Sequence, residues 1–170
     1  MEGMIAGRTA SDMPGLDIAE QRSWQNFLEA AVRVYATLNH GLTEAHQLTV
    51  WDVRLLDMLA HAPARSMRMG DLAEGLMSLP SRVTRQIRRL EEQGMVKRTA
   101  SPEDGRGVVA TLTDIGESAL DRAMVTYSAG VREHFVDRLS RAQVAAMGEN
   151  CRRISTALKA SAEQVTFSRY

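Results

Sequence analysis

The sequence of 170 residues contains a single cysteine, Cys151. One cysteine excludes an intramolecular disulfide and any zinc site built from several cysteines. Aromatic residues are also scarce, at 5%, whereas 44% of the residues are apolar. Because many of those apolar residues are Ala, Leu and Met, which favour helices, the composition predicts a mainly helical protein.

Long apolar runs are absent as well. No run approaches the roughly 18 residues that a membrane-spanning helix requires, and the first thirty residues lack the unbroken apolar stretch of a signal peptide. We therefore expect a cytoplasmic protein that does not associate with membranes.

An excess of either charge is also missing, since 21 basic residues balance 21 acidic ones. Bulk charge therefore does not indicate a nucleic-acid-binding protein, and any basic surface must be local. One stretch does concentrate basic residues against only two acidic ones, Glu91 and Glu92. Its basic residues are Arg82, Arg85, Arg88, Arg89, Lys97 and Arg98.

Helical periodicity is found on both sides of the basic stretch. Residues 1–20 lack a clear period, but from Ser23 to Leu42 apolar residues recur every three or four positions, which predicts a long amphipathic helix. A second helix is expected from Thr49 to Pro63, where proline stops it. Towards the C-terminus, Thr113 can cap one helix and Ser140 opens another. The last helix has an apolar seam with spacings typical of a coiled coil: Val144, Met147, Cys151, Ile154 and Leu158.

The middle of the chain combines a short helix, a basic helix and a hairpin. The short helix is expected over 71–76 and the basic helix over 80–93, with Gly94 as its left-handed terminating residue. Two short β-branched segments, 95–99 and 108–112, flank a turn at Asp104-Gly105, which predicts a hairpin. This order is typical of a winged helix-turn-helix.

One face of the basic helix is apolar and the opposite face is polar. With about 3.6 residues per turn, Val83, Ile87 and Leu90 point into the core. Away from it point Ser81, Arg85 and Arg88, flanked by Arg82 and Thr84. Arginines on such a face can bind guanine edges in a major groove, but the same pattern is also found on ordinary solvated helices.

The hairpin tip favours the DNA interpretation. An Asp-Gly turn explains Gly105 but not the arginine that follows it. Arg106 at a wing tip can enter a minor groove, where narrow A·T stretches deepen the negative potential, and Asp104 can hold it in position. A simple surface ion pair is the alternative, worth at most about 1 kcal/mol.

Together these segments resemble the MarR family of bacterial transcriptional regulators, over roughly residues 22 to 160. The resemblance includes the wing signature of the family, Asp-x-Arg followed by Leu-Thr and then Gly, which here is Asp104, Arg106, Leu112, Thr113 and Gly116. The other matching segments are 72–74, 81–85, 89–91 and 94–98. Leu79 departs from the pattern, which usually has a capping residue there.

The resemblance implies a mainly α protein with a three-helix core, a β-hairpin wing and long dimerisation helices at both ends. It also implies a homodimer that binds a pseudo-palindromic operator in double-stranded DNA, most simply as a repressor. The expected parts are a flexible tail (1–20), a dimerisation helix (21–48), the winged helix-turn-helix (49–112) and C-terminal dimerisation helices (113–165). The residues expected to contact DNA are Ser81, Arg82, Thr84, Arg85, Arg88, Arg98, Asp104 and Arg106.

Many relatives bind small aromatic acids in a crevice between the dimerisation helices and the winged helix. Here His46, Trp51 and Arg54 are candidates, because an arginine beside aromatic surface suits a carboxylate. The alternative is that Trp51 belongs to the core and the histidine to the surface. Other relatives sense peroxide through a cysteine near the first helix, which this chain lacks. Cys151 is expected to be a small buried apolar residue.

The two alternative classes of function are a protein-binding module and an enzyme. A winged helix can bind another protein without binding DNA, and retention of duplex DNA would distinguish the two. For an enzyme, the four histidines and one cysteine provide no credible nucleophile and base or metal site. We therefore expect a non-enzymatic regulator without cofactors, whose partners are DNA, a second copy of itself and, as an open alternative, a small aromatic ligand.

Overall fold

The computed structural model describes residues 13–101 and 107–167, with side chains up to residue 160. The elements follow one another as α1 (Ile18–His46), α2 (Val50–His61), η1 (Pro63–Arg65), β1 (Ser66–Arg68), α3 (Met69–Gly75), α4 (Pro80–Glu92), β2 (Val96–Ala100), β3 (Val108–Leu112), α5 (Asp114–His134), η2 (Val136–Arg138) and α6 (Arg141–Phe167). Asp104 and Arg106, at the predicted wing tip, lie outside the described residues.

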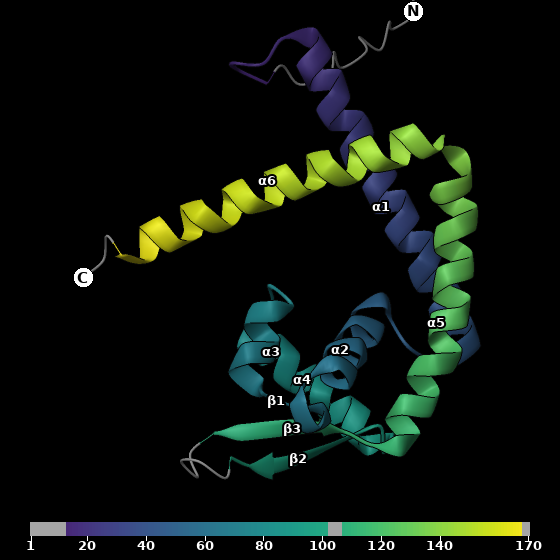
Figure 1. The fold of residues 1–170 in the computed structure, drawn as a ribbon, viewed down its shortest axis with the longest axis vertical. Coiled ribbons are helices and arrows are strands. Elements are labelled where there is room, and N and C mark those ends of the chain that lie inside the picture. The colour runs from purple at the N-terminus through teal and green to yellow at the C-terminus, as the bar shows by residue number, and fades with distance from the viewer. Residues whose placement is uncertain (1–12, 102–106, 168–170) are drawn as a thin grey trace, which may run out of the picture.

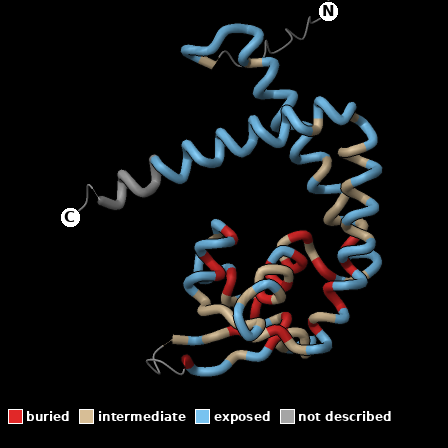
Figure 2. Tube along the Cα trace, viewed as in Figure 1, coloured by how far each residue is buried: buried red, intermediate tan, exposed pale blue. Residues whose placement is uncertain are grey.

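The elements divide into a compact part and an extended part. Helices α2, α3 and α4 and the sheet form the compact part, whereas the long helices α1, α5 and α6 extend away from it (Figure 1). Buried residues gather in the compact part and at the adjoining ends of α1 and α5 (Figure 2). This arrangement confirms the predicted mainly α fold with a winged helix and long terminal helices.

Capping residues set the helix boundaries. Helix α2 begins after Thr49, whose hydroxyl accepts a hydrogen bond from the Asp52 amide at 3.1 Å, and α6 begins after the predicted Ser140–Gln143 capping box. Helix α1 begins at Ile18, earlier than predicted, because Asp17 and Glu20 form a capping box in which each carboxylate accepts from the other's amide. The predicted tail therefore includes the start of α1.

The wing contains one strand more than the sequence indicated. Its three strands are antiparallel in the order β1-β3-β2, with Ser66 opposite Thr111 and Val96 opposite Leu112. The two-strand prediction missed β1 because three residues are too few to show an alternating pattern. The Ser66 and Thr111 hydroxyls also lie 2.7 Å apart, within hydrogen-bonding distance, across this pair of strands.

The long helices do not all pack alike. Helix α5 packs along α1, and its N-terminal part also contacts α2, whereas α6 leaves η2 and makes almost no contact with the other described elements. Cys151 on α6 is consequently exposed, not buried as predicted. The error has a simple cause: an apolar seam is buried only when another surface covers it.

Gly116, the glycine of the wing signature, lies in the first turn of α5 and packs against Met95, just after the end of α4. An added Cβ there would lie 2.1 Å from the carbonyl oxygen of Met95 and 2.7 Å from a methyl of Leu112. Thr113, which caps α5, donates its hydroxyl to the Gly94 carbonyl at 2.6 Å, so the two chain segments are held together at this point.

We predict that Gly116→Ala lowers the free energy of unfolding by about 1–3 kcal/mol, because backbone must move to admit the methyl. Urea denaturation followed by circular dichroism measures the change. Gly41→Ala in α1 is the matched control, since no heavy atom lies within 4 Å of its added Cβ, and it should stabilise the helix by about 0.5–1 kcal/mol. An unchanged midpoint for Gly116→Ala would contradict the close approach.

Candidate nucleic-acid interface

Helix α4 presents the two faces that its sequence predicts. Val83, Ile87 and Leu90 are completely buried, whereas Ser81, Arg85 and Arg88 are exposed on the other side. The helix starts with Pro80, and its N-cap residue Leu79 makes no side-chain cap. The Thr84 hydroxyl donates a hydrogen bond to the Pro80 carbonyl at 2.9 Å. Its oxygen can therefore still accept a hydrogen bond, but its proton is already used.

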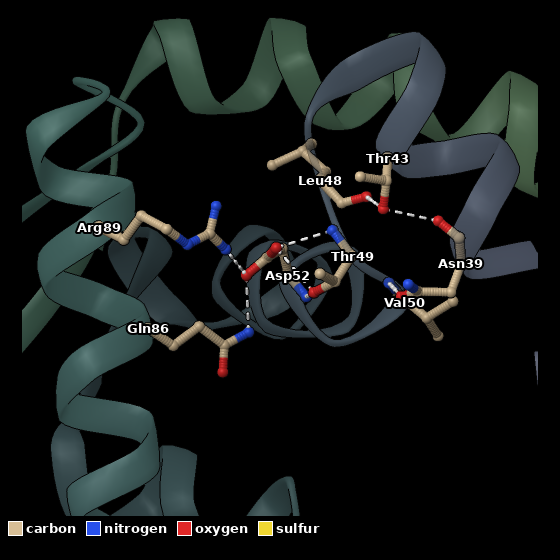
Figure 3. A network of polar contacts seen from close by, with 8 residues as sticks. All are labelled: Asn39, Thr43, Leu48, Thr49, Val50, Asp52, Gln86 and Arg89. Carbon is tan, nitrogen blue, oxygen red and sulfur yellow. Dashed lines mark hydrogen bonds and ion pairs between the residues drawn. The ribbon is translucent and has the colours of Figure 1, made fainter. Parts of the chain in front are cut away.

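A buried carboxylate fixes α4 against α2. Asp52 is fully buried, and its carboxylate accepts hydrogen bonds from the Thr49 amide and hydroxyl, each at 2.7 Å. The same carboxylate accepts from the Gln86 amide group at 2.9 Å and forms an ion pair with Arg89. Figure 3 shows these four interactions converging on Asp52 from α4 and the start of α2. A fully bonded buried carboxylate specifies one geometry, because any displacement leaves a charge uncompensated.

The same corner of the molecule also anchors α1. The side-chain oxygen of Asn39 accepts from the Val50 amide at 3.1 Å, and the Thr43 hydroxyl donates to the Asn39 carbonyl at 2.7 Å (Figure 3). Val50 is the first residue of α2 and directly precedes the Trp51-Asp52 pair. A continuous set of polar contacts therefore connects α1 to α2 and α2 to α4.

A second ion pair engages the base of the wing. Glu91 accepts from the Arg98 backbone amide at 2.9 Å and from its guanidinium at 2.6 Å. These hydrogen bonds from Arg98 hold the pKa of the Glu91 carboxyl below its usual value. Glu91 of α4 therefore fixes the side chain of Arg98, a predicted DNA contact on strand β2.

The basic cluster thus separates into two groups. Arg89 and Arg98 have carboxylate partners, whereas Arg82, Arg85 and Arg88 have none among the described residues. Two guanidiniums lie close to the Trp51 ring: that of Arg82 is 5.8 Å from the ring centre, and that of Arg54 is 5.1 Å from it. The excess positive charge is thereby concentrated on the exposed face of α4 and the adjoining end of α2.

A crevice of about 420 Å³ opens between α1, α2 and α4. It is lined by Tyr35, Asn39, Thr49, Trp51, Asp52, Arg82, Arg85, Gln86 and Arg89. Of the predicted ligand residues only Trp51 lines it. His46 instead lies with its ring nitrogen 2.7 Å from the Thr126 hydroxyl of α5, and Arg54 is stacked on Trp51. Of the residues that form this crevice, the sequence therefore identified only Trp51 as a candidate ligand residue.

Sequence reasoning also missed Asp52 and Gln86. The Thr49-x-x-Asp52 spacing is a capping signal that could have drawn attention to Asp52. Its pairing with Arg89, 37 positions later, depends on how two helices pack, which no local pattern records. Asp104 and Arg106 lie outside the described residues, so their predicted contact with a minor groove stays a prediction.

Two further classes of site are absent from the described parts of the chain. There, no helix is long and apolar enough to cross a membrane, and no group of three or more His, Cys, Asp or Glu side chains is placed to hold a metal ion.

Comparison with known proteins shows which family shares this architecture. The MarR family model matches residues 46–107. The structure is similar to the MarR family transcriptional regulator Sco3205 from Streptomyces coelicolor, solved in complex with DNA, with 34% identity, a TM-score of 0.80 and coverage of 84% of this chain and 93% of that one. AbsC from the same organism, another MarR family regulator, is 29% identical with a TM-score of 0.79, covering 86% and 99%.

Similarity of fold extends further. A mutant of MarR from E. coli complexed with operator DNA has a TM-score of 0.70 at 20% identity, covering 82% of this chain and 99% of that one. No protein of curated function is similar enough to count as a match.

These findings define a winged-helix transcriptional regulator, not an enzyme. The chain belongs to the MarR family, a family of DNA-binding transcriptional regulators, as the wing signature predicted.

We predict that Arg89→Met lowers the free energy of unfolding by about 2–3 kcal/mol, because it leaves the buried Asp52 carboxylate without its cation. The loss is expected below the full value for a buried pair, since the Arg89 side chain is 41% exposed. Arg88→Met is the matched control: the Arg88 side chain is exposed and makes no ion pair or hydrogen bond with the described residues, so the change should stay within about 0.5 kcal/mol. Equal losses in urea denaturation would contradict the role of Asp52.

Proposed function

We propose that this protein is a homodimeric repressor that binds a pseudo-palindromic operator in double-stranded DNA. The observation that carries the proposal is the exposed face of α4, where Arg82, Arg85 and Arg88 have no acidic partner among the described residues. A face with unpaired guanidiniums in a molecule of zero net charge indicates a polyanionic partner. The two similar proteins solved with DNA support the same conclusion.

In the proposed complex α4 lies in the major groove. Ser81, Arg82, Thr84 and Arg85, in its first turns, would meet base edges and phosphates, and a bidentate arginine–guanine pair discriminates by roughly 1–3 kcal/mol. Arg88 and Arg98 would contact the phosphate backbone from the middle of the helix and the base of the wing. Arg106, oriented by Asp104, would enter the adjoining minor groove.

The proposed dimer follows from the uncovered apolar faces of the long helices. On α1, large apolar side chains are 46–58% exposed at Trp24, Phe27, Leu28 and Val32. On α6, Ile154 and Leu158 are 57% and 65% exposed. Exposed apolar surface of this extent on two helices indicates an interface, and a second copy supplies a matching surface by two-fold symmetry. Two recognition helices per dimer would then explain a two-part operator.

Release by a small aromatic acid is the finer part of the proposal. The crevice beside α4 combines the aromatic side chains of Tyr35 and Trp51 with the guanidiniums of Arg82, Arg85 and Arg89. Aromatic walls with convergent cations suit a benzoate-type carboxylate. Because Arg82 and Arg85 also belong to the proposed DNA surface, a bound carboxylate would compete with DNA for their charge.

We predict that Arg85→Ala and Arg106→Ala each weaken binding to the protein's own promoter region by about tenfold, as expected for the loss of one arginine–base contact. A gel-shift titration at fixed salt measures the change, and footprinting should protect two half-sites about one helical turn apart. Arg153→Ala is the control, because Arg153 is an exposed arginine on α6, away from α4.

Benzoate tests the ligand part of the proposal. When the titration is repeated with benzoate present, the affinity of the wild-type protein for its promoter DNA should fall.

Several results would contradict the proposal. If the wild-type protein retains no duplex DNA at moderate salt, a winged helix that binds other proteins becomes the better interpretation. Equal affinities for both arginine variants and the wild type would refute the roles of α4 and the wing. Protection of a single half-site would refute the dimer, and reduced transcription from the operator on deleting the protein would refute repression.

A further inference from the structure

Trp51 lies beside two arginines from different helices. It is the second residue of α2, and its ring is partly buried against the core. The guanidinium of Arg54, one turn along α2, lies 5.1 Å from the ring centre, and that of Arg82, in the first turn of α4, lies 5.8 Å from it. Both distances are within the range of about 6 Å in which a cation is attracted to an aromatic face.

Neither arginine has another partner among the described residues. The side chains of Arg54 and Arg82 make no ion pair or hydrogen bond with the described residues, and both residues are exposed. Two like charges that share one ring repel each other. Asp52, which lines the same crevice as Arg82, is fully buried and already bonded to Gln86 and Arg89. The cluster is therefore short of one negative charge on its solvent side.

We propose that Trp51, Arg54 and Arg82 form a clamp for a DNA backbone phosphate, in which Trp51 is the positioning residue. The proposal rests on the proposed DNA binding and adds α2 to the interface. A phosphate supplies the missing negative charge and offers oxygens to both guanidiniums. The indole restricts the two long side chains before DNA arrives, which reduces the rotamer entropy that binding would otherwise cost.

A phosphate contact has a signature that distinguishes it from reading of a base. Loss of a phosphate contact weakens binding to every sequence alike and lowers the slope of log affinity against log salt by about 1, because one fewer counterion is released. Loss of a base contact weakens the operator but leaves unrelated DNA unaffected. A merely structural role of Trp51 would leave the salt slope unchanged.

The experiment measures the affinity of the full chain for its operator and for an unrelated duplex over a series of salt concentrations. Arg54→Ala should weaken binding to both duplexes by roughly three- to tenfold and lower the slope by about 1. Trp51→Ala should weaken both in the same direction, and Trp51→Ala/Arg54→Ala should be little weaker than Arg54→Ala alone, because the two residues act as one unit. Trp51→Phe, which keeps an aromatic face, should retain most of the affinity. Arg153→Ala is the control for loss of a surface charge.

An unchanged slope and affinity for Arg54→Ala would overturn the proposal, as would effects of Trp51 and Arg54 that multiply in the double variant. If Trp51→Ala does not fold, Arg54→Ala and Trp51→Phe still decide the question. Failure of the wild-type chain to bind any duplex would instead refute the proposed function, so the two failures are distinguishable.

Discussion

The position of α4, the proposed recognition helix, depends on the buried carboxylate of Asp52. A charge removed from water must be compensated by nearby donors, and here Thr49, Gln86 and Arg89 supply them from two helices. Because the compensation requires all of these groups at hydrogen-bonding distance, α4 has one favoured depth and rotation on α2. The adjacent contact between Asn39 and Val50 extends this constraint to α1, the helix whose exposed apolar face we propose as part of a dimer interface.

This constraint also explains how a chain of zero net charge can present a basic surface. The structure sorts the arginines by environment: Arg89 and Arg98 form ion pairs with Asp52 and Glu91, and these pairs hold α4 and β2 in place. The arginines without acids lie on the outer face of α4 and beside Trp51. Acidic residues elsewhere in the chain keep the total at zero without weakening that surface, since exposed charges farther apart than about 10 Å are largely screened at moderate salt.

Much of the fold could be predicted because its signals are local. The buried face of Val83, Ile87 and Leu90, the left-handed Gly94 and the caps at Thr113 and Ser140 each depend on residues within one or two turns. What depends on packing between distant segments could not be predicted. The pairing of Asp52 with Arg89, the short strand β1 opposite β3 and the separation of His46 from Trp51 all require the assembled fold. Cys151 shows the same limit in reverse, because none of the described residues covers it and it is exposed.

The most direct test of this account is the distance between the two α4 helices of the proposed dimer. A spin label on Arg88→Cys in a Cys151→Ser background reports that distance by double electron–electron resonance. The account predicts a single narrow distribution near 35 Å, about one turn of DNA, that becomes broad when Asp52→Asn removes the buried charge. A distribution that is equally narrow in the Asp52→Asn variant, or the absence of any coupling between labels, would contradict it.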